Sequence, residues 1–263
     1  MKVGIFDSGI GGLSVLHHAM KKIPDGEFIY YADEAHVPYG EKSVEEIKTY
    51  IQAIFDFLIK EGVDAILIAC NTATSVATKE FRAQYPVPIV GMEPAVKKAV
   101  ELYGDIGKRI LVAATPVTIA GDKLHNLLER VDVEHDVDLI PLPKLVRFAE
   151  SGDFDSEEVK VYLQEELKKF DLKNYSAVVL GCTHFNYFKE TLRKVFPEDI
   201  HFVDGNEGTV NQLIRITGIE REEKHEKTEP KVTYYYSGKK VSEEESIEIE
   251  NYMRQLDKVY LYS

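Results

Sequence analysis

Short apolar runs alternate along the chain with longer segments whose apolar residues recur every three or four positions. In the first part of the chain, four such runs predict strands: Val3–Phe6, Phe28–Tyr31, Ala65–Ala69 and Ile89–Gly91. Residues Glu45–Lys60 carry apolar side chains at helical spacing and predict an amphipathic helix. Strands that alternate with such helices are typical of an α/β fold with a parallel sheet.

A second series of apolar runs repeats this pattern. It predicts the strands Ile110–Ala113, Asp138–Leu142, Ala177–Gly181 and Ile200–Val203. In both series the third strand leads into a cysteine and polar residues, Cys70-Asn71-Thr72 and Cys182-Thr183-His184. Buried parallel strands resemble one another simply because they are rich in Val, Ile and Leu. The cysteine at the same end of both strands nevertheless favours duplication of one α/β unit.

The tail has a different pattern. A charged stretch, Glu220–Lys227, has the composition of a solvated linker. Val232–Tyr236 then predicts a strand and Glu243–Leu256 an amphipathic helix. We expect this tail to pack back onto one of the two α/β units rather than to form a third domain.

Composition narrows the class of protein. The 263 residues are 44% hydrophobic, enough for a compact enzyme, and the formal net charge is −13. An acidic surface repels phosphate backbones, which disfavours nucleic-acid binding. No apolar run approaches the roughly 18 residues that predict a membrane span, and the first residues do not resemble a signal peptide. We therefore expect a cytoplasmic protein whose two cysteines are reduced thiols.

Polar residues cluster where the predicted strands end, which is where open α/β sheets bind ligands. These residues are Asp7, Ser8, Asp33, Cys70, Asn71, Thr72, Thr115, Cys182, Thr183, His184 and Asp204. A single cysteine in such a place is more often structural. Both cysteines of the chain occur here in related contexts, and this favours a function for them.

Several thiol chemistries fit the sequence poorly. A Cys-x-x-Cys redox motif is absent, a zinc site needs more ligands than His184 supplies, and a cysteine hydrolase leaves one thiol unexplained. Two thiols facing each other across a cleft suit removal of a proton from one face of a carbon and its return to the other, which is racemisation. Asp7 and His184 are natural proton-relay partners, although each alone could be structural, as a helix cap or a buried histidine.

A glycine cluster, Gly9-Ile10-Gly11-Gly12-Leu13-Ser14, follows the first predicted strand. Together with Asp33 it resembles a dinucleotide-binding fingerprint, but Ser14 stands where the third glycine belongs. The glycines more readily indicate a loop whose backbone approaches a small substrate.

From about Val3 to Asn211 the sequence resembles the glutamate racemase family. Four blocks carry the resemblance, and their joint order is highly specific. They are Gly4-Ile5-Phe6-Asp7-Ser8-Gly9-Ile10-Gly11-Gly12, the block from Asp33 through Pro38-Tyr39-Gly40-Glu41-Lys42-Ser43, Ala69-Cys70-Asn71-Thr72-Ala73-Thr74, and Leu180-Gly181-Cys182-Thr183-His184.

The resemblance implies two similar three-layer α/β domains with mainly parallel sheets, pseudo-symmetric, with the site at their interface. The first domain would comprise residues 1–97 plus 207–263, and the second residues 98–206. It also implies a homodimer and a reaction without cofactor or metal. The product, D-glutamate, would supply bacterial peptidoglycan.

The resemblance further assigns roles to single residues. Cys70 and Cys182 would be the two acid/base groups, assisted by Asp7 and His184 respectively, with the acidic Glu150 near the site. The expected substrate contacts are Asp7, Ser8, Tyr39, Gly40, Asn71, Thr72, Thr74, Thr115, Thr118, Thr183 and His184.

The sequence departs from the family pattern at Ala120-Gly121-Asp122-Lys123 and at Leu142-Pro143, which affects expected local packing rather than the thiols. It starts six residues before Asp7, without the N-terminal extension associated with activation by a wall precursor, so no such control is expected. Two alternatives stay open. One is an aspartate racemase of the same mechanism, and the other is an amino-acid-binding module without catalysis.

Overall fold

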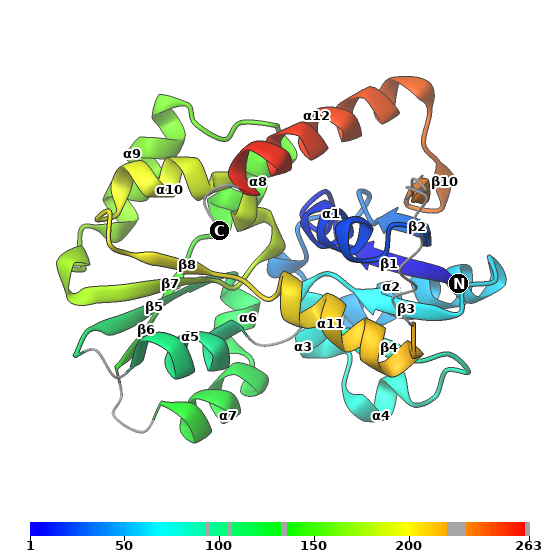
Figure 1. Ribbon diagram of the computed structural model, residues 1–263, viewed down its shortest axis with the longest axis horizontal. Helices are drawn as coiled ribbons and strands as arrows, with labels where there is room; N and C mark the ends of the chain where they lie inside the picture. Colours follow the sequence, from blue (N-terminus) through cyan, green and yellow to red (C-terminus); the bar gives the residue numbers. More distant parts are fainter. Residues whose placement is uncertain (93–94, 105–106, 133–135, 220–229, 261–263) are drawn as a thin grey trace.

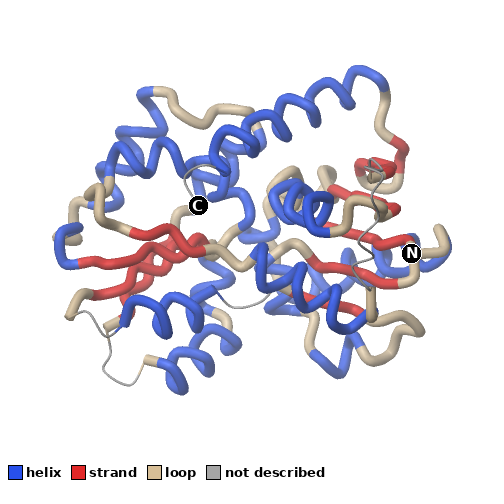
Figure 2. Tube along the Cα trace, in the orientation of Figure 1, coloured by secondary structure: helices blue, strands red, loops and turns tan. Residues whose placement is uncertain are grey.

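The computed structural model describes residues 1–92, 95–104, 107–132, 136–219 and 230–260. The predicted linker 220–227 lies outside the described residues. The described chain forms two sheets side by side, each covered by helices (Figures 1 and 2). The first sheet contains β1 (Lys2–Asp7), β2 (Glu27–Ala32), β3 (Ala65–Ile68), β4 (Ile89–Gly91), β9 (Lys231–Tyr236) and β10 (Lys239–Lys240). The second contains β5 (Arg109–Ala114), β6 (Val137–Pro141), β7 (Tyr175–Leu180) and β8 (His201–Val203).

The two sheets repeat one topology. Strands run in the order β10-β9-β2-β1-β3-β4 in the first sheet and β6-β5-β7-β8 in the second, so β2-β1-β3-β4 corresponds to β6-β5-β7-β8. Every paired strand is parallel except β10 against β9. The predicted α/β class with mainly parallel, pseudo-symmetric sheets is confirmed.

All eight strands predicted in the two series are present, with each end within two residues of the prediction. The predicted strand at Asp138–Leu142, for example, is Val137–Pro141. Strand ends follow the hydrogen-bond ladder, whereas the prediction followed hydrophobicity, so small differences are expected.

Helices connect the strands. They are α1 (Leu13–Lys22), α2 (Val44–Lys60), α3 (Asn71–Val76), α4 (Lys79–Arg82), α5 (Ala95–Tyr103), α6 (Pro116–Ala120), α7 (Asp122–Val131), α8 (Pro143–Glu150), α9 (Glu157–Leu167), α10 (Lys189–Val195), α11 (Asn206–Thr217) and α12 (Glu243–Val259), with 3-10 helices η1 (Tyr39–Glu41), η3 (Leu172–Asn174) and η4 (Thr183–Phe188). Helix α2 shows why the pattern works. Ser43 and Glu46 form a capping box at its start. The apolar side chains at helical spacing are all buried: Ile47, Ile51, Ile54, Phe55 and Leu58.

The tail spans both halves of the molecule. Strand β9 extends the first sheet by pairing with β2, while α12 packs on α1 and on η4 (Figure 1, red helix). The described tail thus adds a strand to the first sheet and a helix that contacts both halves. No helix in the described ranges is long and apolar enough to cross a membrane.

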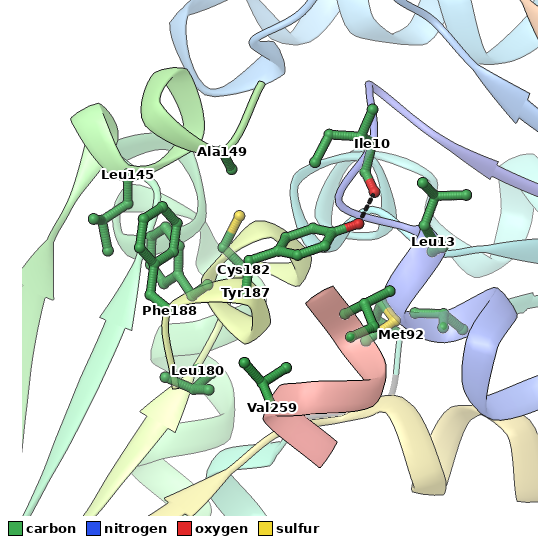
Figure 3. Close-up of a cluster of buried hydrophobic side chains, with 14 of the residues drawn as sticks. Ile10, Leu13, Met92, Leu145, Ala149, Leu180, Cys182, Tyr187, Phe188 and Val259 are labelled. Atoms are coloured by element: carbon green, nitrogen blue, oxygen red, sulfur yellow. Dashed lines mark hydrogen bonds between the residues drawn. The ribbon is translucent and has the colours of Figure 1, made fainter. Parts of the chain in front are cut away.

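One buried cluster joins the two halves. It includes Val3 and Leu13 from the first half, Leu111 and Leu180 from the second, and Val259 from α12. Figure 3 shows part of this cluster around Tyr187, whose hydroxyl donates a hydrogen bond of 2.9 Å to the carbonyl of Ile10. Since burying a large apolar side chain contributes roughly 1.5–3 kcal/mol, a shared core fixes the two sheets relative to each other.

Candidate active site

The two cysteines occupy equivalent places. Cys70 lies two residues beyond the end of β3, and Cys182 lies two residues beyond the end of β7. Each is the residue that precedes a helix, α3 for Cys70 and η4 for Cys182. Both are free thiols and nearly inaccessible, with 5% and 6% of their surface exposed. The duplicated topology therefore delivers one thiol from each half of the molecule.

Cys70 sits among main-chain and carboxyl groups. Its Sγ accepts a hydrogen bond from the Ala73 N–H at 3.3 Å and lies 4.0 Å from Ser8 Oγ. Burial raises the pKa of the Cys70 thiol well above its usual value, and the negative charges of Asp7 and Cys182 raise it further. The preferred resting form of Cys70 is therefore the protonated thiol, and Asp7 and Cys182 lie close to it.

Cys182 sits beside an imidazole. Its Sγ lies 3.6 Å from His184 Nδ1, and His184 Nε2 is 2.5 Å from Glu150 Oε1. Burial lowers the pKa of His184, but hydrogen bonds to Cys182 and Glu150 and the charge of Glu150 outweigh it, so the pKa is raised well above its usual value. The Glu150–His184 pair thus presents a protonated imidazole to Cys182.

Asp7 connects the two halves. Its Oδ2 accepts hydrogen bonds from the Gly12 N–H at 2.5 Å and from Thr183 Oγ1 at 3.3 Å. Its Oδ1 is buried without a hydrogen-bond partner among the described residues. Burial raises the pKa of Asp7, against the opposing charge of His184. The N-cap residue of α1 is Gly12 rather than Asp7, although the Asp7 carboxylate accepts the N–H of that residue.

The glycine loop packs against these groups. A Cβ atom on Gly9 would lie 1.9 Å from Glu150 Oε1, and one on Gly11 would lie 2.4 Å from His184 Nδ1. The Ile10 N–H between them donates to Glu150 Oε1 at 3.0 Å. The glycines therefore allow the first half of the molecule to lie close to Glu150 and His184 of the second half. The sequence predicted only that this loop approaches the substrate.

Three threonine hydroxyls meet at the interface. Thr72 Oγ1 lies 3.0 Å from Thr115 Oγ1 and 3.4 Å from Thr118 Oγ1, and Thr115 donates to Thr118 at 3.0 Å. Gly40 faces Thr115, because a Cβ there would lie 3.0 Å from the Thr115 Cβ. This cluster offers hydroxyl donors for a carboxylate.

Thr74 and Asn71 were also predicted as substrate contacts, but their surroundings differ from those of the threonine cluster. The Thr74 hydroxyl donates to the Ile68 carbonyl at 3.5 Å and accepts from the Met92 N–H at 3.0 Å, which ties together β3 and the chain beyond β4. Asn71 is half-buried at the start of α3. The structure links neither side chain by a hydrogen bond to the other predicted site residues within the described ranges.

Asp33 and Asp204 also have structural partners. Tyr39 donates to Asp33 Oδ2 at 2.6 Å, His36 Nδ1 lies 2.8 Å from Oδ1, and Ser237 Oγ donates to Oδ1 at 3.2 Å. Both carboxylate oxygens of Asp33 are thus engaged, which leaves the ribose role of a dinucleotide site unsupported. Asp204 pairs with the buried Lys189 at 2.8 Å.

The structure adds a carboxyl group that sequence reasoning missed. Glu34 is half-buried, and its Oε1 is buried without a partner in the described part of the chain. Burial and the charge of Glu150 raise the pKa of Glu34 to about 8. The only signal in the sequence is its position directly after Asp33, at the end of β2. Across the described residues, no group of three or more His, Cys, Asp or Glu side chains could hold a metal ion.

The geometry defines a class of site: two buried thiols from matching strand ends, one near a buried carboxyl group and the other beside an imidazole. The model of the Asp/Glu/hydantoin racemase family matches residues 13–213. A glutamate racemase of Campylobacter curvus is 52% identical to the chain, over 98% of each sequence.

Solved structures agree. The Escherichia coli glutamate racemase in complex with L-glutamate and the activator UDP-MurNAc-ala has a TM-score of 0.80 at 27% identity, covering 97% of this chain and 94% of that one. The Francisella tularensis glutamate racemase in complex with D-glutamate has a TM-score of 0.78 at 27% identity, covering 96% and 93%. The chain therefore belongs to the Asp/Glu/hydantoin racemase family and is a racemase, an enzyme of the isomerase class.

Proposed function

We propose that the chain interconverts L- and D-glutamate without a cofactor, using Cys70 and Cys182 as the two acid/base groups. The observation that carries the proposal is the pairing of equivalent thiols with different partners. Cys70 adjoins Ser8 and Asp7, and Cys182 adjoins the imidazole of His184. A reaction that passes a proton from one face of a carbon to the other needs one such group on each side.

The reaction balances in protons. One cysteine, as thiolate, takes the α-proton, and the electron pair of the broken C–H bond remains on the α-carbon and its carboxylate. The thiol on the other face then gives its proton to the α-carbon, which inverts the centre. Asp7 would relay protons to Cys70, and the Glu150–His184 pair would do so for Cys182. After each turnover the two cysteines have exchanged protonation states.

The hydroxyl groups at the interface are suited to hold the substrate. The cluster of Thr72, Thr115 and Thr118 supplies donors for a carboxylate. The unpartnered Oδ1 of Asp7 is an acceptor suited to the substrate ammonium group. We also assign substrate contacts to Ser8, Tyr39, Gly40, Asn71, Thr74, Thr183 and His184, which the sequence resemblance implies.

Glutamate is favoured over aspartate by the relatives. The curated Campylobacter curvus protein, 52% identical, is a glutamate racemase, and the two structural neighbours hold L- and D-glutamate. By the same resemblance we propose that the chain works in the cytoplasm as a homodimer, that residues 1–97 plus 207–263 and 98–206 form its two domains, and that its D-glutamate enters peptidoglycan.

The test is incubation of the purified chain with L-glutamate in D2O without added cofactor. Optical rotation and the α-proton NMR signal would be followed, with a parallel L-aspartate sample. We expect rotation to decay and deuterium to enter the α-position for glutamate only. Cys70→Ala and Cys182→Ala should each abolish net racemisation while remaining folded.

Each other outcome has a clear meaning. Racemisation of aspartate instead would keep the two-thiol chemistry and replace the substrate. A folded, reduced protein that racemises neither amino acid but binds glutamate would be the amino-acid-binding module, and the enzyme proposal would be wrong.

A further inference from the structure

The C-terminal helix α12 reaches the Glu150–His184 pair through one tyrosine. The Tyr252 hydroxyl donates a hydrogen bond of 3.1 Å to the main-chain carbonyl of Glu150. Glu150 is the last residue of α8, and carbonyls in the last turn of a helix lack partners within that helix. The bond from Tyr252 therefore anchors the chain at the point from which the Glu150 side chain departs.

Packing fixes the Tyr252 hydroxyl in place. The Tyr252 ring meets Tyr187 edge-on, with 5.7 Å between ring centroids, and Phe154 edge-on at 6.1 Å. One turn further along α12, Gln255 Nε2 donates to the main-chain carbonyl of Tyr187 at 3.3 Å. These edge-to-face contacts hold the Tyr252 ring in one orientation, with its hydroxyl at the Glu150 carbonyl.

The two residues whose carbonyls α12 holds, Glu150 and Tyr187, both bind the same residue of the glycine loop through their side chains. Glu150 Oε1 accepts from the Ile10 N–H at 3.0 Å, and the Tyr187 hydroxyl donates to the Ile10 carbonyl at 2.9 Å (Figure 3). Helix α12 thus holds the main chains of Glu150 and Tyr187, and their side chains hold Ile10. The Glu150 carboxylate is the one that contacts His184 Nε2.

We propose that Tyr252 is a positioning residue for the Cys182 half of the site. By holding the main chain of Glu150, it keeps the Glu150 carboxylate on His184 and the imidazole of His184 on Cys182. The expected effect on kcat rests on the proposed function. The expected effect on the placement of Glu150 and His184 does not. Within the described residues, no hydrogen bond joins α12 to Cys70, Ser8 or Asp7, so the effect should be confined to one half.

The test is Tyr252→Phe, which removes the hydroxyl and keeps the ring. Loss of one hydrogen bond of about 1 kcal/mol corresponds to roughly fivefold, so we expect kcat to fall about fivefold with KM changed by less than about twofold. Because Glu150 raises the pKa of His184, a less well held carboxylate should lower that pKa and shift the pH profile of kcat downward.

A spectroscopic readout separates this inference from the racemase proposal. The His184 ring signal, identified by its loss in His184→Asn, would be titrated by NMR in the wild type and in Tyr252→Phe. We expect a lower midpoint in the variant, whether or not the chain turns over glutamate. Tyr260→Phe is the matched control, since that tyrosine follows α12 and packs on Lys21 and His17 instead.

Two results would overturn the inference. One is a Tyr252→Phe protein with the wild-type His184 midpoint and pH profile. The other is a variant whose only change is a lower melting temperature, which would give Tyr252 a purely structural role.

Discussion

Cys70 and Cys182 stand at matching ends of matching strands, yet their surroundings differ. Cys70 accepts a main-chain N–H at the start of α3 and lies near the buried carboxyl of Asp7, whereas Cys182 adjoins an imidazole that Glu150 holds. The repeated topology therefore explains where the thiols lie, and their different neighbours would set how each exchanges its proton in the proposed mechanism. A racemase needs symmetry only in the placement of the two groups around the α-carbon.

The largest effect is expected from His184→Asn. This change removes the imidazole beside Cys182, and general acid–base groups contribute roughly 10²–10⁴-fold to rates. We expect net racemisation to fall by about 10²-fold or more, measured as kcat from the decay of optical rotation. The pH dependence of alkylation, followed for each cysteine by mass spectrometry, should change less at Cys70 than at Cys182. A change at Cys70 as large as at Cys182 would contradict the separation into two halves.

Gly9→Ala should disrupt the Cys182 half of the site through a steric clash. The new Cβ would lie 1.9 Å from Glu150 Oε1, so Glu150 must move away from His184. Overpacking of this kind costs about 1–3 kcal/mol, and we expect a lower melting temperature with about a tenfold loss of kcat. Gly104→Ala is the control, because the Cβ there meets only Val100 at 3.5 Å, an ordinary contact. Equal stability of the two variants would disprove the close approach.

Asp7→Asn tests the Cys70 half of the site. Burial and then the charge of Asp7 raise the pKa of the Cys70 thiol, and the amide removes that charge. The pKa of Cys70 should therefore fall, and alkylation of Cys70 at a fixed pH below that pKa should accelerate. The measurement is the rate of iodoacetamide labelling of each cysteine against pH. An unchanged Cys70 profile would show that Asp7 does not act on this thiol.

The smallest effect on the rate of racemisation is expected at Glu34, where the change is in folding stability. The folded chain keeps the Glu34 proton up to a pKa of about 8, whereas the unfolded chain releases it near the ordinary value of 4.5. Folding stability should therefore fall as the pH rises between these values and then level off. Glu34→Gln removes this loss, so its melting temperature should gain on the wild type from pH 5 to pH 8. Glu129→Gln, on the exposed face of α7, should run parallel to the wild type.

The sequence predicts most of the fold and the centre of the site because both depend on local pattern. Apolar runs mark the strands, and the residues that follow Ile68 and Leu180 place both thiols at strand ends. Tyr252 was not predicted because its role depends on α12 packing on η4, and Glu34 was not predicted because its pKa depends on burial and on the charge of Glu150. Such long-range packing leaves no signal in spacing. The expected substrate role of Thr74 remains a prediction, since its hydroxyl bonds two main-chain groups.

The most direct test of the two-thiol account is hydrogen exchange by single-thiol variants. Cys70→Ala and Cys182→Ala would each be incubated in D2O with L-glutamate and, separately, with D-glutamate, and α-deuterium would be measured by NMR. We predict that each variant exchanges the α-proton of one enantiomer without racemising it, and that the enantiomer is opposite in the two variants. Exchange of the same enantiomer by both variants, or net racemisation by either, would contradict the account.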